Sequence, residues 1–180
     1  MAKKKSVKSG AKKMKKSDVA AAHLLKAADM GRLQATFSHP WNPNSEVTGV
    51  QMGARMGLKR TGVNFVRIAA GKEGYIPHAH QREEEWVYIL YGQGEALIGD
   101  AWFPVGTGDF LAFPAPQVVH HLKNTSSEDL VCLMGGEALD FEVVDFPTIG
   151  RRVVQAGEER TVYDAKSAAT FGPPKPKKKK

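Results

Sequence analysis

The chain has 180 residues, 42% of them hydrophobic and 25% charged, which is enough to bury the core of one domain. Its one cysteine, Cys132, excludes an internal disulfide and a thiolate metal cluster, and it lies in an apolar run where we expect a buried, inert thiol. No apolar run reaches the length of a membrane span, and no apolar segment of a secretory signal follows the basic start. We therefore expect a cytoplasmic protein.

The net charge of +7 is unevenly distributed along the chain. Residues 1–17 hold eight lysines and residues 172–180 hold five, whereas residues 18–171 hold 13 basic and 19 acidic residues, a net of −6. The two lysine-rich tails contain little that could be buried, so we expect them to be disordered. Because no aromatic residues alternate with the lysines, any binding to polyanions by the tails would be weak and independent of sequence.

The next segments precede the expected domain core. Residues 18–35 are predicted to form a short helical extension that Asp18 can cap and Gly31 ends. The stretch that follows, to about residue 60, is expected to be irregular, because its two prolines and many turn formers disfavour both helix and central strand.

Short β-rich segments separated by turn-forming residues occupy residues 61–146. We expect strands at Val63–Ala69, Tyr75–His80, Glu84–Tyr91, Glu95–Ile98, Ala101–Val105, Phe110–Phe113, Val118–Asn124, Leu130–Met134 and Phe141–Asp145. This spacing is typical of an all-β sandwich or barrel, and the absence of an intervening helical pattern disfavours βαβ units. In residues 147–180 we expect a C-terminal extension, with a strand or irregular lid near residues 151–154 and then a polar tail.

Histidine and glutamate residues gather in two segments of this region. His78 and His80 are two residues apart on an expected strand, so their side chains point the same way. Glu85 begins the next strand and lies beside them if the two strands pair as a hairpin. Two imidazoles and a carboxylate placed in this way can bind a single metal ion. His120, from a strand on the opposite side of the barrel, can supply a fourth ligand to the same ion.

The first of these segments resembles a motif of a known family. The pattern His-x-His, four residues, Glu, six residues, Gly occurs at His78, His80, Glu85 and Gly92 and resembles the first motif of the cupins. The string from Glu85 to Tyr88, followed by Gly92, is also similar to the first barrel of bicupin oxalate decarboxylases.

The second segment resembles the second cupin motif. Gly108, five residues, Pro114, and then His120, three residues, Asn124 fit that motif, although one extra residue precedes the histidine. This leaves a choice between His120 and His121 as the ligand. We choose His120, because it keeps the spacing to Asn124 and because alternation along a strand turns His121 away.

The resemblance implies a small single-barrel cupin, a double-stranded β-helix of the jelly-roll type over residues 36–146. Three imidazoles and one carboxylate suit one divalent transition metal, which could be Fe, Mn, Zn, Ni or Cu, and they leave coordination positions open. We therefore expect a metal-dependent oxygenase, decarboxylase or isomerase that acts on a small molecule inside the barrel. The alternative is non-catalytic binding of a sugar or small acid. Cupins often dimerise, so the resemblance also implies a homodimer.

Alternation along the expected strands predicts which side chains line the pocket. The predicted lining residues share a face with the ligands: Ile76, Val87, Ile89, Tyr91, Val118 and Leu122. Tyr91 is the only one of these that has a proton to donate. In the turn between the two ligand strands, Glu83 and Glu84 could be acid–base groups, but we expect them to be solvated. Arg82, in the same turn, could hold a carboxylate substrate or lie at the surface.

Overall fold

The computed structural model describes residues 16–116 and 118–167. The lysine-rich tails, whose disorder we predicted, therefore lie outside the described residues, except for residues 16 and 17, which begin the first helix. The helices are α1 (Lys16–His23), α2 (Ala27–Leu33) and α3 (Met52–Arg55). The strands are β1 (Ala35–Phe37), β2 (Val47–Val50), β3 (Thr61–Ile68), β4 (Ala79–His80), β5 (Glu85–Tyr91), β6 (Gln93–Ile98), β7 (Ala101–Gly106), β8 (Phe110–Phe113), β9 (His120–Lys123), β10 (Leu130–Glu137), β11 (Phe141–Phe146), β12 (Arg151–Ala156) and β13 (Glu159–Asp164).

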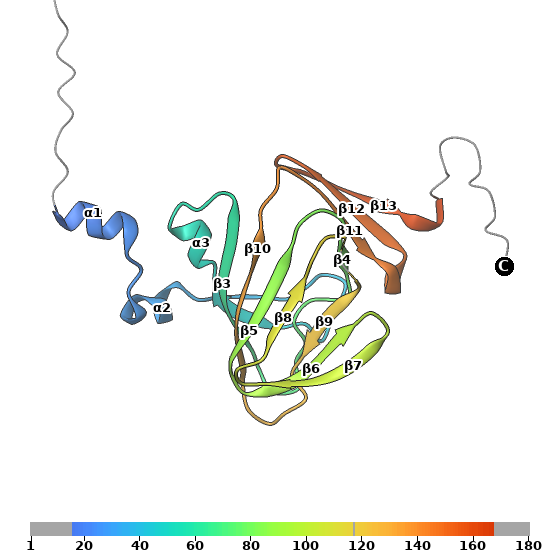
Figure 1. Cartoon of the computed structure of the whole chain (residues 1–180), viewed down its shortest axis with the longest axis horizontal. Coiled ribbons are helices and arrows are strands. Elements are labelled where there is room, and N and C mark those ends of the chain that lie inside the picture. The colour runs from blue at the N-terminus through green and yellow to red at the C-terminus, as the bar shows by residue number, and fades with distance from the viewer. Residues whose placement is uncertain (1–15, 117, 168–180) are drawn as a thin grey trace, which may run out of the picture.

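The strands form three antiparallel sheets, and the predicted all-β class is confirmed. The orders are β1-β2-β3-β10-β5-β8, β13-β12-β11-β4 and β7-β6-β9. Figure 1 shows these sheets wound around one another, with α1 and α2 beside the strands and the hairpin of β12 and β13 on the other side. The arrangement is a double-stranded β-helix, in which closely spaced turns carry the chain from one sheet to another.

The core lies between the facing sheets and follows the alternation of the strands. Along β10 the inward-facing Leu130 and Cys132 are fully buried, and along β5 Ile89 is fully buried. They pack with apolar residues from β2, β3, β6, β8 and β9. Burial raises the pKa of the Cys132 thiol to about 12, which agrees with the inert thiol expected from the sequence.

The prediction for the N-terminal part was wrong in two respects. The helical extension is broken between α1 and α2, and α2 continues through Gly31 to Leu33. The stretch expected to be irregular contains β2, which pairs with β3 from Val47 opposite Ile68 to Val50 opposite Phe65. A four-residue strand shows little periodicity of its own, and here its partner strand determines its conformation.

The C-terminal extension is more regular than the sequence indicated. Residues 151–156 and 159–164 form a hairpin, and β12 pairs with β11 along its whole length. Gly157, at the hairpin turn, has a φ of 61°, a value that favours glycine. Within the described part of the chain, no helix combines the length and apolarity needed to cross a membrane.

Candidate metal centre

The four predicted ligands come from all three sheets and meet at one place. His80 ends β4, Glu85 begins β5 and His120 begins β9. His78 precedes β4 and lies directly opposite His120, and the two residues exchange backbone hydrogen bonds of 3.1 and 2.8 Å. This paired bridge sets two of the imidazoles side by side before any metal binds.

The expected hairpin between the two ligand-bearing strands does not form. β4 pairs with β11, whereas β5 pairs with β10 and β8. The turn at residues 81–84 therefore carries the chain from one sheet to another. Glu85 still reaches the histidines, because the ends of the two sheets meet at this turn. Gly136 lies opposite Glu85, and a Cβ at Gly136 would be 3.0 Å from Cγ of Glu85.

The ligand atoms converge on one carboxylate oxygen. Oε2 of Glu85 lies 3.1 Å from Nε2 of His120, 3.4 Å from Nε2 of His80 and 3.9 Å from Nε2 of His78. Donor atoms bound about 2.0–2.2 Å from one ion are separated by roughly 3–4 Å. The donor atoms of His78, His80 and Glu85 all lie within 4.8 Å of one another. These three residues therefore fit a transition-metal ion held by nitrogen and oxygen, and His120 contacts the same oxygen of Glu85.

Contacts on the far side of the rings direct the Nε2 atoms toward this point. Nδ1 of His78 lies 2.7 Å from the carbonyl oxygen of Ile76, and Nδ1 of His120 lies 3.2 Å from that of Val118. A carbonyl can only accept, so Nδ1 of His78 carries the proton and its Nε2 keeps its lone pair. Nδ1 of His80 faces Oε2 of Glu83 at 3.5 Å. Outer contacts of this kind orient metal-binding histidines and increase their basicity.

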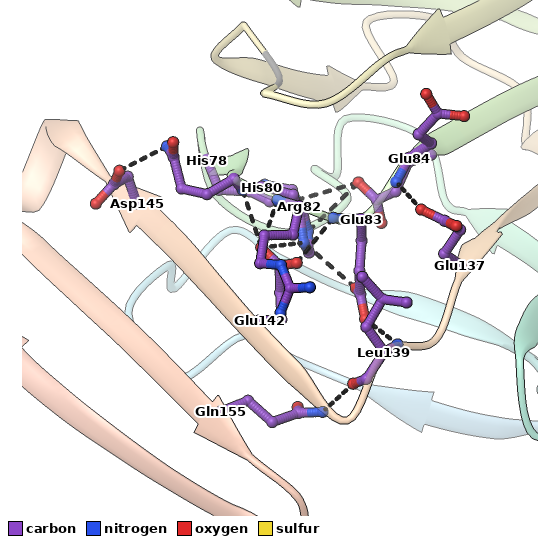
Figure 2. Close-up of polar contacts among 12 residues, drawn as sticks. His78, His80, Arg82, Glu83, Glu84, Glu137, Leu139, Glu142, Asp145 and Gln155 are labelled. Atoms are coloured by element: carbon purple, nitrogen blue, oxygen red, sulfur yellow. Dashed lines mark hydrogen bonds and ion pairs between the residues drawn. The ribbon is translucent and has the colours of Figure 1, made fainter.

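A buried glutamate from β11 holds the turn that joins the ligands. Only 2% of Glu142 is exposed, and its two carboxylate oxygens accept backbone N–H groups from Gln81 (2.9 Å), Arg82 (3.2 Å) and Glu83 (2.8 Å). Oε1 of Glu83 in turn accepts the N–H of Leu139 at 2.8 Å. Figure 2 shows Glu142 beneath the turn, with these contacts as dashed lines.

The turn is therefore not the solvated loop that the sequence suggested, at least at Glu83. The side chain of Glu83 is 14% exposed and faces His80, whereas Arg82 lies over the ring of Phe141 with its guanidinium 5.4 Å from the centroid. Nη1 of Arg82 also donates to the carbonyl of Phe141. The sequence contained no sign of this, because the partners of the turn come from β11, far along the chain.

The electrostatics of the cluster favour neutral imidazole at His78 and an ionised Glu85. Burial and the neighbouring His120 lower the pKa of His78 to about 3. Burial raises the pKa of Glu85, but the hydrogen bond from His120 and the charges of the histidines outweigh it, so the net pKa is lowered. For His80, burial is outweighed by the contacts with Glu83 and Glu85, which raise its pKa. At neutral pH a metal ion would therefore meet no proton on Nε2 of His78.

The metal-free protein is expected to lose stability as the pH falls, through His78. An unfolded histidine takes up a proton near pH 6.5, whereas folded His78 does so only near pH 3. Its contribution is therefore present above pH 6.5 and is lost as the pH falls toward 3. Between pH 7 and pH 4 this amounts to roughly 3 kcal/mol in the free energy of unfolding.

Urea unfolding of chelator-treated protein at both pH values measures this loss, and His78→Asn provides the comparison. Between pH 7 and pH 4, the free energy of unfolding of the variant should fall by roughly 3 kcal/mol less than that of the wild type, because the variant lacks the group that resists protonation. An equal loss in both proteins would show that His78 is not the group responsible.

His121 lies next to a predicted ligand but has a different partner. It is 5% exposed, and its Nε2 lies 3.1 Å from Oε2 of Glu73. Its ring packs edge-on against Trp102 at 5.9 Å between centroids. The geometry thus brings His120, and not its neighbour, to Glu85.

A cavity of about 480 Å³ opens beside the ligands, within the range of small-molecule sites. Of the predicted lining residues, Val87 and Leu122 line it. Phe113 stacks on His120 with ring centroids 4.0 Å apart, and Phe146 stacks on His78 at 6.0 Å. These two phenylalanines form an apolar wall around the ligand imidazoles.

The other four predicted lining residues lie outside the cavity lining. Ile76 and Ile89 are buried, and Ile89 belongs to the apolar core. Tyr91 is 54% exposed and donates its hydroxyl to Glu128, because the pairing of β5 with β10 shifts register just before Tyr91 and breaks the alternation. Val118 is 52% exposed in the loop before β9.

Several polar residues of the lining were not anticipated, among them Tyr75 and Arg160. Tyr75 lines the cavity in place of Tyr91, and burial together with the charge of Glu85 raises the pKa of its phenol. The alternation argument missed it because regular strand begins only at Ala79. Arg160, on β13, also lines the cavity, in a segment that the sequence predicted to be a tail.

Comparison with known proteins identifies the family. Residues 64–136 match the model of the cupin domain. A crystal structure of a proposed sugar phosphate isomerase from Acidithiobacillus ferrooxidans matches 83% of this chain and 97% of its own, with 32% identity and a TM-score of 0.79. The chain belongs to the cupin superfamily. No curated protein sequence matched it.

Two further cupin structures share the fold at lower identity. A sugar phosphate isomerase from Silicibacter pomeroyi, described as from a cupin superfamily, has 20% identity and a TM-score of 0.71, and the match covers 82% of this chain and 96% of that one. A predicted oxalate decarboxylase from Thermotoga maritima has 21% identity and a TM-score of 0.53, with 64% and 99% covered. The predicted resemblance to cupins is confirmed.

Proposed function

We propose that this cupin is a metal-dependent enzyme that acts on a small molecule held in the cavity of its barrel. The observation that carries the proposal is the convergence of three imidazole Nε2 atoms on one oxygen of Glu85, at the wall of that cavity. A cluster that only stabilised the fold would have no need of an adjacent cavity.

His78, His80, Glu85 and His120 would hold one divalent ion of iron, manganese, zinc, nickel or copper. When bound, such an ion supplies a Lewis acid that polarises an oxygen of the substrate. The chain's own residues shape the rest of the site. Phe113 and Phe146 keep water from the ligand rings, and Tyr75 places a hydroxyl donor in the cavity.

The reaction best supported is isomerisation of a phosphorylated sugar. The support is the likeness, at 32% identity over most of both chains, to a structure described as a proposed sugar phosphate isomerase. Aldose–ketose interconversion moves a proton or hydride between neighbouring carbons, and it needs no external oxidant. The oxygenase and decarboxylase reactions implied by the cupin resemblance are the enzymatic alternatives, and binding without turnover is the non-catalytic one.

The test is turnover of a panel of aldose and ketose phosphates by the full chain, reconstituted separately with each of the five metals and followed by NMR. We expect conversion with at least one metal and a loss of more than about 100-fold in Glu85→Gln, which keeps the shape of the side chain but weakens the metal site. Glu95→Gln is the matched control, since Glu95 pairs with Lys123 outside the cavity lining and the ligand group, and this variant should keep most of the activity.

The outcomes separate the candidates. Conversion that survives Glu85→Gln would contradict metal dependence at this site. Tight binding of a sugar phosphate without conversion, whichever metal is supplied, would contradict the enzyme and support the non-catalytic binding module.

A further inference from the structure

Among the described residues that line the cavity, Arg160 is the only lysine or arginine. It projects from β13, which belongs to the sheet that also carries β4 and thus His80. Two acidic residues, Glu85 and Glu137, line the same cavity. A ligand with a negative group would be repelled by both carboxylates, so Arg160 is the residue that can offset this repulsion.

The guanidinium of Arg160 is oriented but not neutralised. Its Nε donates to Oε1 of Gln155 at 2.8 Å, directly across the β12–β13 hairpin. Nε2 of Gln155 in turn donates to the carbonyl of Leu139 at 3.2 Å, a contact visible in Figure 2. A neutral amide thus fixes the guanidinium through Nε and leaves its two Nη groups available. This pair of groups can bind an oxyanion in bidentate fashion.

Other arginines on this side of the molecule are already engaged. Arg152 makes a two-point contact with Asp145, with Nη2 2.8 Å from Oδ2. Arg151 lies over the ring of Trp41, 4.6 Å from its centroid. For Arg160, no ion pair with a carboxylate is found within residues 16–116 and 118–167.

We propose that Arg160 binds the phosphate group of the substrate through its two Nη groups, while the rest of the substrate extends toward the proposed metal ligands. The inference rests on the proposed function, which places a phosphorylated sugar in this cavity, and it assigns the residue that holds the phosphate. The C-terminal hairpin lies outside residues 64–136, which match the cupin domain. On this inference the hairpin contributes to ligand selectivity.

Calorimetric titration of the full, manganese-loaded chain with fructose 6-phosphate and with fructose tests this inference. The wild type should bind the phosphorylated sugar more tightly than the neutral one. Arg160→Met should weaken binding of fructose 6-phosphate by roughly 10- to 100-fold, the usual worth of hydrogen bonds to a charged group, and leave fructose unaffected. Arg160→Lys keeps a positive charge without the bidentate geometry, so its affinity for fructose 6-phosphate should fall less than that of Arg160→Met.

Two further variants exclude general damage to the fold. Arg67→Met makes the same substitution at an arginine paired with Asp129 outside the cavity lining, and it should bind fructose 6-phosphate as the wild type does. Gln155→Leu keeps the arginine but removes its positioning contact, so its affinity should lie between those of the wild type and Arg160→Met.

Equal binding of fructose 6-phosphate by Arg160→Met and the wild type would overturn the inference, as would tighter binding of gluconate, a carboxylate, than of the phosphate. Failure of the proposed enzyme is distinguishable. Arginine-dependent phosphate binding without turnover supports the anchor and rejects the catalyst, whereas turnover with an unchanged KM in Arg160→Met does the reverse.

Discussion

Replacement of His120 by glutamine is expected to reduce the bound metal from about one equivalent to almost none after gel filtration. His120 supplies the nitrogen nearest to Glu85, at 3.1 Å, and its backbone pairs with that of His78. Loss of an outer contact weakens metal affinity by about 10- to 100-fold, and loss of a proposed direct ligand should weaken it by more. Elemental analysis by inductively coupled plasma mass spectrometry of untagged protein measures the ratio.

The matched control is His121→Gln, the same substitution one residue along β9. Because His121 contacts Glu73 and not Glu85, this variant should keep its metal. Thermal unfolding of both variants shows whether they fold. Retention of metal by His120→Gln, or equal loss from the two variants, would contradict the assignment of His120 as a ligand.

Glu142→Ala is expected to lower the free energy of unfolding by about 3 kcal/mol and the metal affinity by roughly 10- to 100-fold. The carboxylate accepts three backbone N–H groups of the ligand turn, and these would lose a charged partner in a poorly solvated place. The turn would then no longer hold His80 and Glu85 at their present separation. Urea unfolding and competition with a chelator measure the two effects separately.

Glu137→Ala is the comparison, because Glu137 accepts one backbone N–H, that of Glu84, at a more exposed position. We expect it to cost about 1 kcal/mol or less. Glu142→Gln, which retains one acceptor oxygen, should be intermediate. If Glu142→Ala were no more harmful than Glu137→Ala, the turn would not depend on the buried carboxylate.

The proposed ligand residues could be grouped from the sequence because their signal is local. His78 and His80 lie two residues apart, and Glu85 follows within a single turn, so one short segment carries three donors. The turn glycine of that motif, Gly92, has a φ of 85°, and a Cβ there would lie 2.3 Å from the carbonyl oxygen of Asp129. Here the need for glycine is set by the backbone itself.

What the sequence did not reveal depends on contacts between distant segments. Glu142 reads as an ordinary strand residue until β11 is placed against β4. Arg160 lies in a polar segment without strong periodicity, and it joins the sheet because β13 pairs with β12, which in turn pairs with β11. The prediction of a hairpin between β4 and β5 was wrong for the same reason. Alternation indicates on which face of a strand a side chain lies, but not with which strand that strand pairs.

β4 consists of only two residues, and it joins the sheet of β11, β12 and β13 through His80 opposite Val144 and Ala79 opposite Asp145. A metal ion that requires His80 in place therefore disfavours every local opening that carries this edge away, by an amount that grows with metal concentration. Amide hydrogens of β12 and β13 would then exchange with solvent more slowly in the metal-bound protein, although neither strand supplies a ligand. Occupancy of the proposed metal site and order in the C-terminal sheet would then be coupled parts of one equilibrium.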